Sequence, residues 1–106
     1  MDLKLVYVTF PSLETAEMAV RELVKARLAA CGNILPGLVS IYEWQGTLER
    51  AQEVIVFLKT RADLVNNLIT ELTGLHPYET PAILVLPVDH AAAAFSAWVG
   101  AQTRPA

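Results

Sequence analysis

The amino-acid sequence predicts an α+β fold in which helices cover one face of an antiparallel sheet. Apolar residues follow strand-like and helix-like spacing in the order strand, helix, strand, strand, helix, strand, and a last helix follows. Both alternating faces of the two middle strands are apolar, as expected where both faces of a sheet are covered. This order is typical of the ferredoxin-like βαββαβ sandwich. We therefore expect residues 1–106 to form a single domain of this fold with an extra C-terminal helix.

The first predicted strand and the first predicted helix are separated by a proline. Residues 3–10 are rich in β-branched and aromatic side chains and therefore favour a strand. Pro11 ends this strand, and Ser12 is a suitable N-cap for the helix after it. Apolar residues at helical spacing extend this predicted helix as far as Leu28.

A hairpin is predicted after an irregular stretch. Residues 29–36 mix residue types, and Gly32 and Pro36-Gly37 are expected to break regular structure. Residues 38–44 and 53–59 are predicted to be strands, with Gln45-Gly46 as the turn signal between them. Helices in so short a chain can cover only one face of the sheet. We therefore expect another subunit to cover the opposite face.

A second helix is predicted from the apolar stripe of residues 64–72. Thr60 and Asp63 resemble a capping box at its start. Gly74 is placed to end the helix, because glycine favours the conformation found at helix C-termini.

The C-terminal part of the chain is predicted to contain a strand and a last helix. Residues 83–88 form a short apolar run, and Asp89 is a suitable cap for the helix that follows. Residues 103–106 are expected to be a frayed tail. The inner face of the last helix is predicted to contain Ala94, Phe95, Trp98 and Val99.

The composition favours an oligomer and excludes several classes of protein. Hydrophobic residues make up 54% of the chain, and the mean hydropathy of +0.40 is apolar for a small domain, so we expect apolar surface that a partner covers. A net charge of −3 without a basic patch argues against nucleic acid, and no apolar run is long enough to cross a membrane. With Cys31 as the only cysteine and no recognisable leader, a cytoplasmic protein without disulfides is expected.

The segment between the second helix and the last strand concentrates polar side chains between two prolines. Residues 75–81 read LHPYETP, which holds an imidazole, a phenol and a carboxylate at His76, Tyr78 and Glu79. Each proline fixes its own φ and biases the preceding residue toward extended backbone. The segment is therefore a stiff connector, suited either to hold a binding site or to form a structural corner.

Four sequence blocks resemble the CutA family, also called divalent-cation tolerance proteins. The blocks are LAACGN (28–33), SIYEWQG (40–46), KT (59–60) and HPYE (76–79), and the resemblance extends over residues 6–98. It implies a ferredoxin-like subunit assembled as a homotrimer, with long hairpins that reach neighbouring subunits as in PII-type signalling trimers. It also implies a role tied to copper or another divalent metal.

The chain departs from the family pattern at three places. Some members of the family carry additional cysteines, whereas this chain has only Cys31. Ala82 stands where the family often has glutamate, and Phe95 replaces an aromatic hydroxyl. These differences reduce the number of available metal ligands and argue against a thiolate-rich copper site.

Three residues are candidate metal ligands. His76 is the strongest candidate because imidazole suits Cu(II), Zn and Ni; alternatively it binds the backbone of the connector. Cys31 is a thiolate candidate, although a lone cysteine is more often a small buried hydrophobe. Glu79 can share a site with His76 only if the connector turns. If a metal binds, we expect ligands from more than one subunit.

The remaining candidates concern a cleft and an interface. The resemblance places Lys59 near the connector, where it would bind an anion or pair with Glu79; alternatively its stem reaches solvent from a strand end. Tyr78 is a second candidate cleft residue. Tyr42, Trp44 and Trp98 are predicted to lie at the trimer interface, because aromatic side chains supply large contact areas.

Two functional hypotheses follow. The first is a cytoplasmic homotrimer that binds a divalent metal, copper above others, at clefts between subunits through His76 with Cys31 or Glu79. The second is a PII-like sensor or scaffold whose clefts bind a small anion or a protein partner. No motif of a hydrolase, a P-loop or a dinucleotide-binding site is present, so neither an enzyme nor an organic cofactor is expected.

Overall fold

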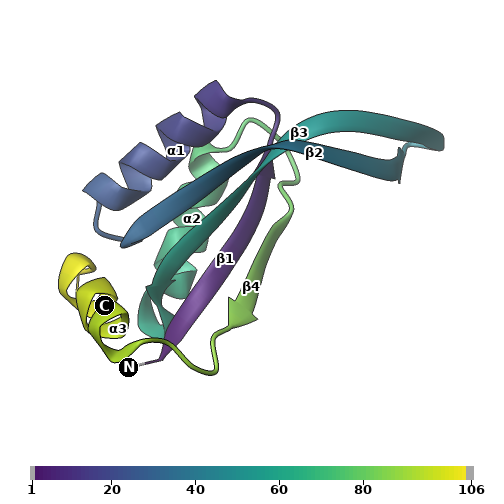
Figure 1. Cartoon of the computed structure of the whole chain (residues 1–106). Helices are drawn as coiled ribbons and strands as arrows, with labels where there is room; N and C mark the ends of the chain where they lie inside the picture. Colours follow the sequence, from purple (N-terminus) through teal and green to yellow (C-terminus); the bar gives the residue numbers. More distant parts are fainter. Residues whose placement is uncertain (1, 105–106) are drawn as a thin grey trace.

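The computed structural model describes residues 2–104 and contains, within them, one four-stranded antiparallel sheet with three α-helices (Figure 1). The sheet order is β2-β3-β1-β4, which confirms the predicted ferredoxin-like βαββαβ arrangement with an extra C-terminal helix. The elements are β1 (Leu3–Phe10), α1 (Leu13–Lys25), β2 (Cys31–Trp44), β3 (Thr47–Arg61), the 3₁₀-helix η1 (Ala62–Leu64), α2 (Val65–Leu75), β4 (Ile83–Pro87) and α3 (Ala93–Gln102).

The main core lies between the sheet and the two helices α1 and α2. Alternate residues of β1 and β3 point toward these helices and are fully or almost fully buried. Figure 1 shows both helices on the same side of the sheet. The strand residues of this core are Val6, Val8, Phe10, Val54, Val56 and Leu58, and the helix residues are Ala16, Ala19, Val20, Leu23, Leu68 and Leu72.

The opposite, helix-free face of the sheet is also apolar. Cross-strand partners share a face, so the register places Leu5 beside Leu86 and Tyr7 between Leu84 and Phe57 on this side. Leu84 is 60% exposed. Among the described helices, α3 is the one that packs at the end of this face, where Val99 meets Leu3 and Ala30.

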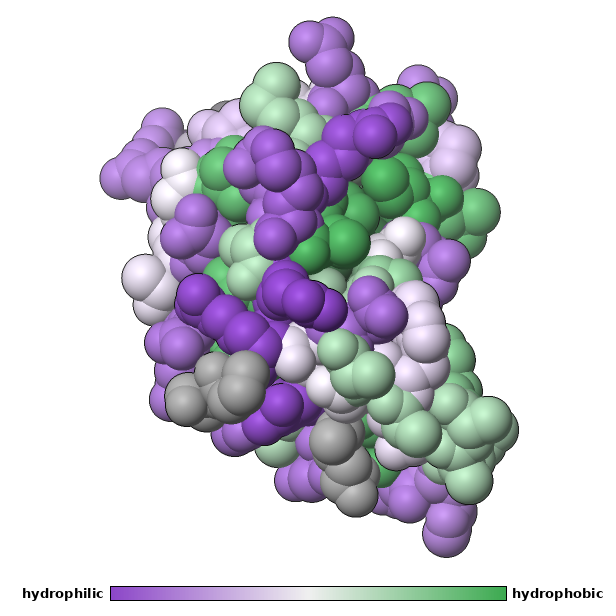
Figure 2. Space-filling model, turned by 90° about the vertical axis from the view of Figure 1, so that its left-hand side faces the viewer, coloured by the Kyte–Doolittle hydropathy of each residue, from purple (hydrophilic) through white to green (hydrophobic). Residues whose placement is uncertain are grey.

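The outer side of the molecule near α1 and α3 is a mosaic (Figure 2). Hydrophilic side chains cross this surface, and hydrophobic side chains are exposed between them. The exposed side of α1 contributes Glu14, Glu17, Arg21 and Glu22, opposite its buried stripe.

The prediction of an irregular stretch over residues 29–36 was wrong from Cys31 onward, because β2 begins there. Pro36 is tolerated there since β2 is an edge strand and needs no ladder hydrogen bond on its outer side. Gly37 has a φ of +93° and is left out of the pairing, so the register shifts between Pro36 and Leu38. A β-bulge, and not a break, separates the two halves of this strand.

The first helix ends earlier than predicted, at Lys25 instead of Leu28. Arg27 has a φ of +62°, and its N–H donates to the Val24 carbonyl at 3.0 Å while the Leu28 N–H donates to the Leu23 carbonyl at 3.0 Å. This is the Schellman arrangement, in which glycine usually occupies the position of Arg27. Here the Arg27 guanidinium donates to the carbonyls of Gln102 and Ala101, so it ties this corner to the end of α3.

Two of the predicted caps were also wrong. Thr60 is completely buried, and its hydroxyl donates to the Leu28 carbonyl at 2.6 Å instead of capping α2. Asp63 pairs with Arg61, and within residues 2–104 no side chain caps the start of α3, so Asp89 does not have the predicted role. Gly74 lies inside α2, which continues for one more residue.

The end of α3 is more ordered than the predicted frayed tail. Thr103 is buried, and its hydroxyl donates to the Val99 carbonyl at 2.9 Å. Residues 105 and 106 of the predicted tail lie outside the described part of the chain. Within residues 2–104, no helix is both long enough and apolar enough to cross a membrane.

Candidate functional site

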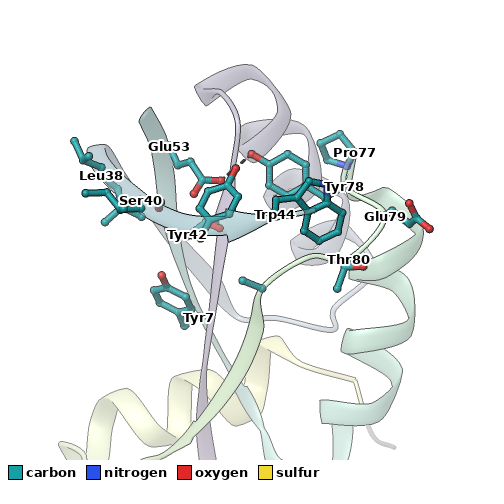
Figure 3. Close-up of a pocket in the computed structure, with 14 residues that line it drawn as sticks. Tyr7, Leu38, Ser40, Tyr42, Trp44, Glu53, Pro77, Tyr78, Glu79 and Thr80 are labelled. Atoms are coloured by element: carbon teal, nitrogen blue, oxygen red, sulfur yellow. Dashed lines mark hydrogen bonds between the residues drawn. The ribbon is translucent and has the colours of Figure 1, made fainter. Parts of the chain in front are cut away.

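A groove of about 810 Å³ lies between the outer half of the β2–β3 hairpin, residues 38–44 of β2, and the connector that follows α2 (Figure 3). Four aromatic side chains line it, from β1, β2 and the connector, together with two carboxylates. Its volume is within the range of small-molecule sites, about 300–1,000 Å³. These six residues are Tyr7, Tyr42, Trp44, Glu53, Tyr78 and Glu79.

The bulge at Gly37 determines which side of the hairpin faces this groove. Leu35 pairs with Ile55, but after the extra residue Leu38 pairs with Glu53. From there, every second residue of β2 is directed to the groove side, which includes Tyr42 and Trp44. Without the extra residue, the other set of β2 side chains would face the groove.

Glu53 is the most buried charged side chain of the groove, with 8% exposure. The Tyr78 hydroxyl donates a hydrogen bond of 2.7 Å to its Oε2 atom. Burial, together with this hydrogen bond, raises the pKa of the Tyr78 phenol above its ordinary value. The two ion pairs within residues 2–104 are Lys4–Asp2 and Arg61–Asp63, so neither of them neutralises Glu53.

His76 is buried against the end of β1, with 8% exposure, and both of its ring nitrogens are engaged. Its Nε2 atom lies 2.7 Å from the Thr9 carbonyl oxygen, and the Tyr78 N–H donates to Nδ1 at 3.1 Å. This pair of contacts assigns the proton to Nε2. The ring also stacks on Phe10 with a centroid distance of 4.3 Å. A metal at Nδ1 would have to displace the Tyr78 N–H.

Burial lowers the pKa of His76, because the imidazolium form is poorly solvated in this position. The hydrogen bond to the Thr9 carbonyl and the nearby Glu53 carboxylate act in the opposite direction and are weaker. His76 is therefore held in the neutral form, and in this conformation its two hydrogen bonds fix the connector to the end of β1.

The structure does not bring the three candidate metal ligands together within one subunit. Cys31 pairs with Lys59, which lies opposite Leu5 of β1. His76 contacts Thr9, which lies four residues, or about 13 Å, further along β1 than Leu5. Figure 3 shows Glu79 pointing away from the buried carboxylate of the groove. Within residues 2–104 no three His, Cys, Asp or Glu side chains are grouped so that they could hold a metal ion.

Cys31 lines a second, shallower groove between α1 and the edge strand β2. Its volume is about 460 Å³, and its walls include Val20 and Val24 with the basic side chains Arg21 and Lys25. Cys31 itself is partly exposed and forms no disulfide. The thiol is thus accessible from the surface, but other thiols or imidazoles do not line this groove.

The other predicted site residues are distributed over the helix-free side. Tyr78 lies in the large groove, whereas Lys59 lies on β3 beside Leu5 and Cys31, so within one subunit it is not next to the connector. Tyr42, Trp44 and Trp98 are each about half exposed, and Trp98 stacks with Phe95 at 5.8 Å.

The profile of the family described as "CutA1 divalent ion tolerance protein" matches residues 4–102. This chain belongs to that family. The CutA relative from Thermus thermophilus, named divalent-cation tolerance protein, is 39% identical over 100 residues, which are 94% of this chain and 97% of the relative. The human protein CutA is 39% identical over 98 residues, which are 92% of this chain. The chain spans only 55% of the human protein and 62% of the Xenopus laevis homolog.

Solved CutA structures have the same fold as this chain. CutA from Xylella fastidiosa superposes with a TM-score of 0.95 at 40% identity, covering 98% of this chain and 100% of that one. CutA1 from Oryza sativa gives a TM-score of 0.97 at 30% identity, covering 100% of this chain and 97% of that one. Relatives described as chloroplastic and periplasmic indicate that CutA proteins occupy more than one compartment.

Sequence reasoning missed Glu53 and Tyr7 as groove residues in this CutA chain. Glu53 was placed only at the start of a strand, although the same face of that strand continues with Ile55 and Phe57. A carboxylate at an otherwise apolar face is the signal that could have identified it. Tyr7 carries no comparable signal, because an aromatic residue in a strand is ordinary.

Proposed function

We propose that this chain functions as a homotrimer in divalent-cation tolerance and binds a divalent cation, copper above others, at clefts between subunits. The observation that carries this proposal is the match to the CutA1 divalent ion tolerance family over residues 4–102. The proposal places the protein in the cytoplasm and assigns it no catalytic reaction.

The apolar surface supports the oligomeric part of the proposal. Leu35 and Leu84 on the helix-free face are each 60% exposed, and Leu48 near the hairpin tip is 74% exposed. The hairpin extends beyond the other elements in Figure 1, and an isolated two-stranded hairpin is marginally stable in water. A neighbouring subunit that packs on this face and on the hairpin would bury these side chains.

The donor set supports copper as the first metal to test. Imidazole and thiolate both suit copper, and His76, Cys31 and Glu79 supply one imidazole, one thiolate and one carboxylate. Because these three groups do not form one cluster within the described part of a subunit, the proposed site combines His76 with Cys31 or Glu79 from different subunits. Binding at Nδ1 of His76 would exchange the Tyr78 N–H for the metal.

Calorimetric titration of the metal-free protein with Cu(II) tests the proposal. We expect His76→Ala to lower the affinity at least tenfold, because the imidazole is the strongest ligand of the set. His90→Ala is the matched control, since His90 is an exposed histidine outside the groove. Equal binding by the wild type and His76→Ala would remove His76 from the site.

A second candidate function is a PII-like trimer that senses a small molecule or a protein partner. The specific observation in its favour is the groove, whose volume exceeds what one metal ion requires. Native mass spectrometry of the protein purified from cells without added ligand separates the two candidates. A retained organic molecule supports the sensor, and a retained metal supports the first proposal.

A further inference from the structure

Two charged side chains on the helix-free face have no ionic partner within the described part of their own subunit. Glu53 is 8% exposed and has the Tyr78 hydroxyl as its hydrogen-bond donor. The fourteen described residues that line the groove around it include no lysine, arginine or histidine. Lys59 is half-buried on the same strand, and neither of the two ion pairs within residues 2–104 includes it. A buried carboxylate is costly unless a cation compensates it.

The strand register places these two charges on one face but far apart. Glu53 and Lys59 are six residues apart on β3, so their side chains point to the same side and begin about 20 Å from each other. Arg61 lies on this face as well, but it already pairs with Asp63. Among the described strand residues of this face, Lys59 is therefore the cation that can compensate Glu53, and it cannot reach Glu53 of its own chain.

A closed trimer brings different parts of this face together. In a cyclic trimer each interface is heterologous, so a patch of one subunit meets a different patch of its neighbour. A carboxylate toward the hairpin and an ammonium toward the opposite end of the strand can therefore meet across each interface. The same contact then repeats at all three interfaces, and every charge of the pair is compensated.

We propose that Lys59 of the neighbouring subunit enters the groove and forms a buried ion pair with Glu53 at each interface of the trimer. This inference rests on the proposed homotrimer and names the two residues that complete the cleft between subunits. The hydrogen bond from Tyr78 engages Oε2 of Glu53, which leaves Oε1 to accept from the ammonium. The carbon stem of the lysine lies against Tyr42 and Trp44, which line the groove together with Glu53 (Figure 3).

The surroundings of the two charges are complementary as well. Lys59 lies between Cys31 and Leu5 in the sheet, and Leu86 lies beyond Leu5. The lining of the groove contains four aromatic side chains. A lysine side chain alone does not fill about 810 Å³, so we expect the apolar side chains beside Lys59 to enter the groove with it.

Urea titration of the full chain, followed by light scattering, tests this inference with a double-mutant cycle. We expect Glu53→Gln and Lys59→Met each to lower the urea concentration at which the trimer separates by about 1 M or more, because each leaves the opposite charge buried without a partner. The double variant leaves neither charge behind and should recover at least half of that loss. Glu71→Gln and Lys25→Met remove the same charges from exposed positions on α2 and α1 and should behave like the wild type.

Cross-linking locates the pair between subunits. In a Cys31→Ala background, Glu53→Cys combined with Lys59→Cys gives each chain two thiols, and we expect a short bismaleimide to link three chains. Each single-cysteine variant can link at most two chains and is the control. A link within one chain is excluded, because the two positions are about 20 Å apart on β3.

Two outcomes would overturn this inference while leaving the trimer and the copper proposal standing. One is single variants that separate like the controls, or whose losses add up in the double variant. The other is a trimeric double-cysteine variant that yields no three-chain product. A wild type that is a single subunit would overturn the inference together with the trimer. The double-mutant cycle decides the question even if the double-cysteine variant does not assemble.

Discussion

At the residue scale, hydrogen bonds decide what a polar side chain is available to do. His76 is the strongest metal ligand by residue type, yet Thr9 and Tyr78 engage both of its ring nitrogens. Thr60 is a helix cap by spacing, yet its hydroxyl is buried against the Leu28 carbonyl. In both cases the partner is a backbone group more than 30 residues away or a neighbour fixed by a proline turn. Local spacing contains no information about such partners.

The neutral, buried state of His76 predicts a pH dependence of stability. Because the folded pKa lies below the ordinary value of about 6.5, the unfolded state binds more protons as the pH falls below that value. The contribution of His76 is therefore complete above about pH 6.5 and is lost below it, with a slope of at most ~1.4 kcal/mol per pH unit. Urea unfolding between pH 8 and pH 5.5, compared with His76→Gln, measures this contribution.

The control for this prediction is His90→Gln, which removes an exposed histidine and should keep the pH dependence of the wild type. Parallel stability curves for the wild type and His76→Gln would show that the burial of His76 does not penalise its charged form.

At the element scale, periodicity predicted the order of strands and helices but not the length of the hairpin. The core strands and the two main helices bury one face each, and this burial leaves a repeat in the sequence. The bulge interrupts the alternation of apolar residues along β2, and Pro36-Gly37 is a pair of residues that is equally common in loops. The sequence therefore does not distinguish a bulge from a loop at this point. Sequence reasoning consequently shortened β2 by seven residues at its start, from Cys31 to Leu38. The same bulge directs Tyr42 and Trp44 to the groove, so the groove could not be predicted either.

Gly→Ala substitutions in the bulge and in α2, at Gly37 and Gly74, are expected to have opposite effects on stability. In the described part of the chain, no atom lies within 4 Å of a Cβ at Gly37 or Gly74, so neither substitution is limited by space. Gly37 has a φ of +93°, and we expect Gly37→Ala to destabilise the fold by about 1 kcal/mol. Gly74 lies in α2, so Gly74→Ala should stabilise it by up to about 1 kcal/mol. Denaturant unfolding of both variants checks the signs, and a neutral Gly37→Ala would show that the bulge does not require glycine.

At the scale of the whole molecule, one subunit buries only one of the two faces of its sheet. The side chains of β1 and β3 that point toward α1 and α2 form a dense core, whereas those on the helix-free face remain partly in water. The surplus of apolar residues in the composition predicted this situation. The composition does not predict the number of subunits, because an apolar face can be buried in oligomers of different symmetry.

The proposed trimer predicts that one charge on the helix-free face will separate the subunits. Leu84 is already 60% exposed, so Leu84→Glu costs little within a single subunit but places a carboxylate in the proposed interface. We expect light scattering to report three times 11.6 kDa for the wild type and a single 11.6 kDa subunit for Leu84→Glu. Met18→Glu is the matched control, because Met18 is equally exposed but lies on α1, away from this face, and it should leave the trimer intact. A wild type that remains a single subunit at micromolar concentration would exclude sites shared between subunits.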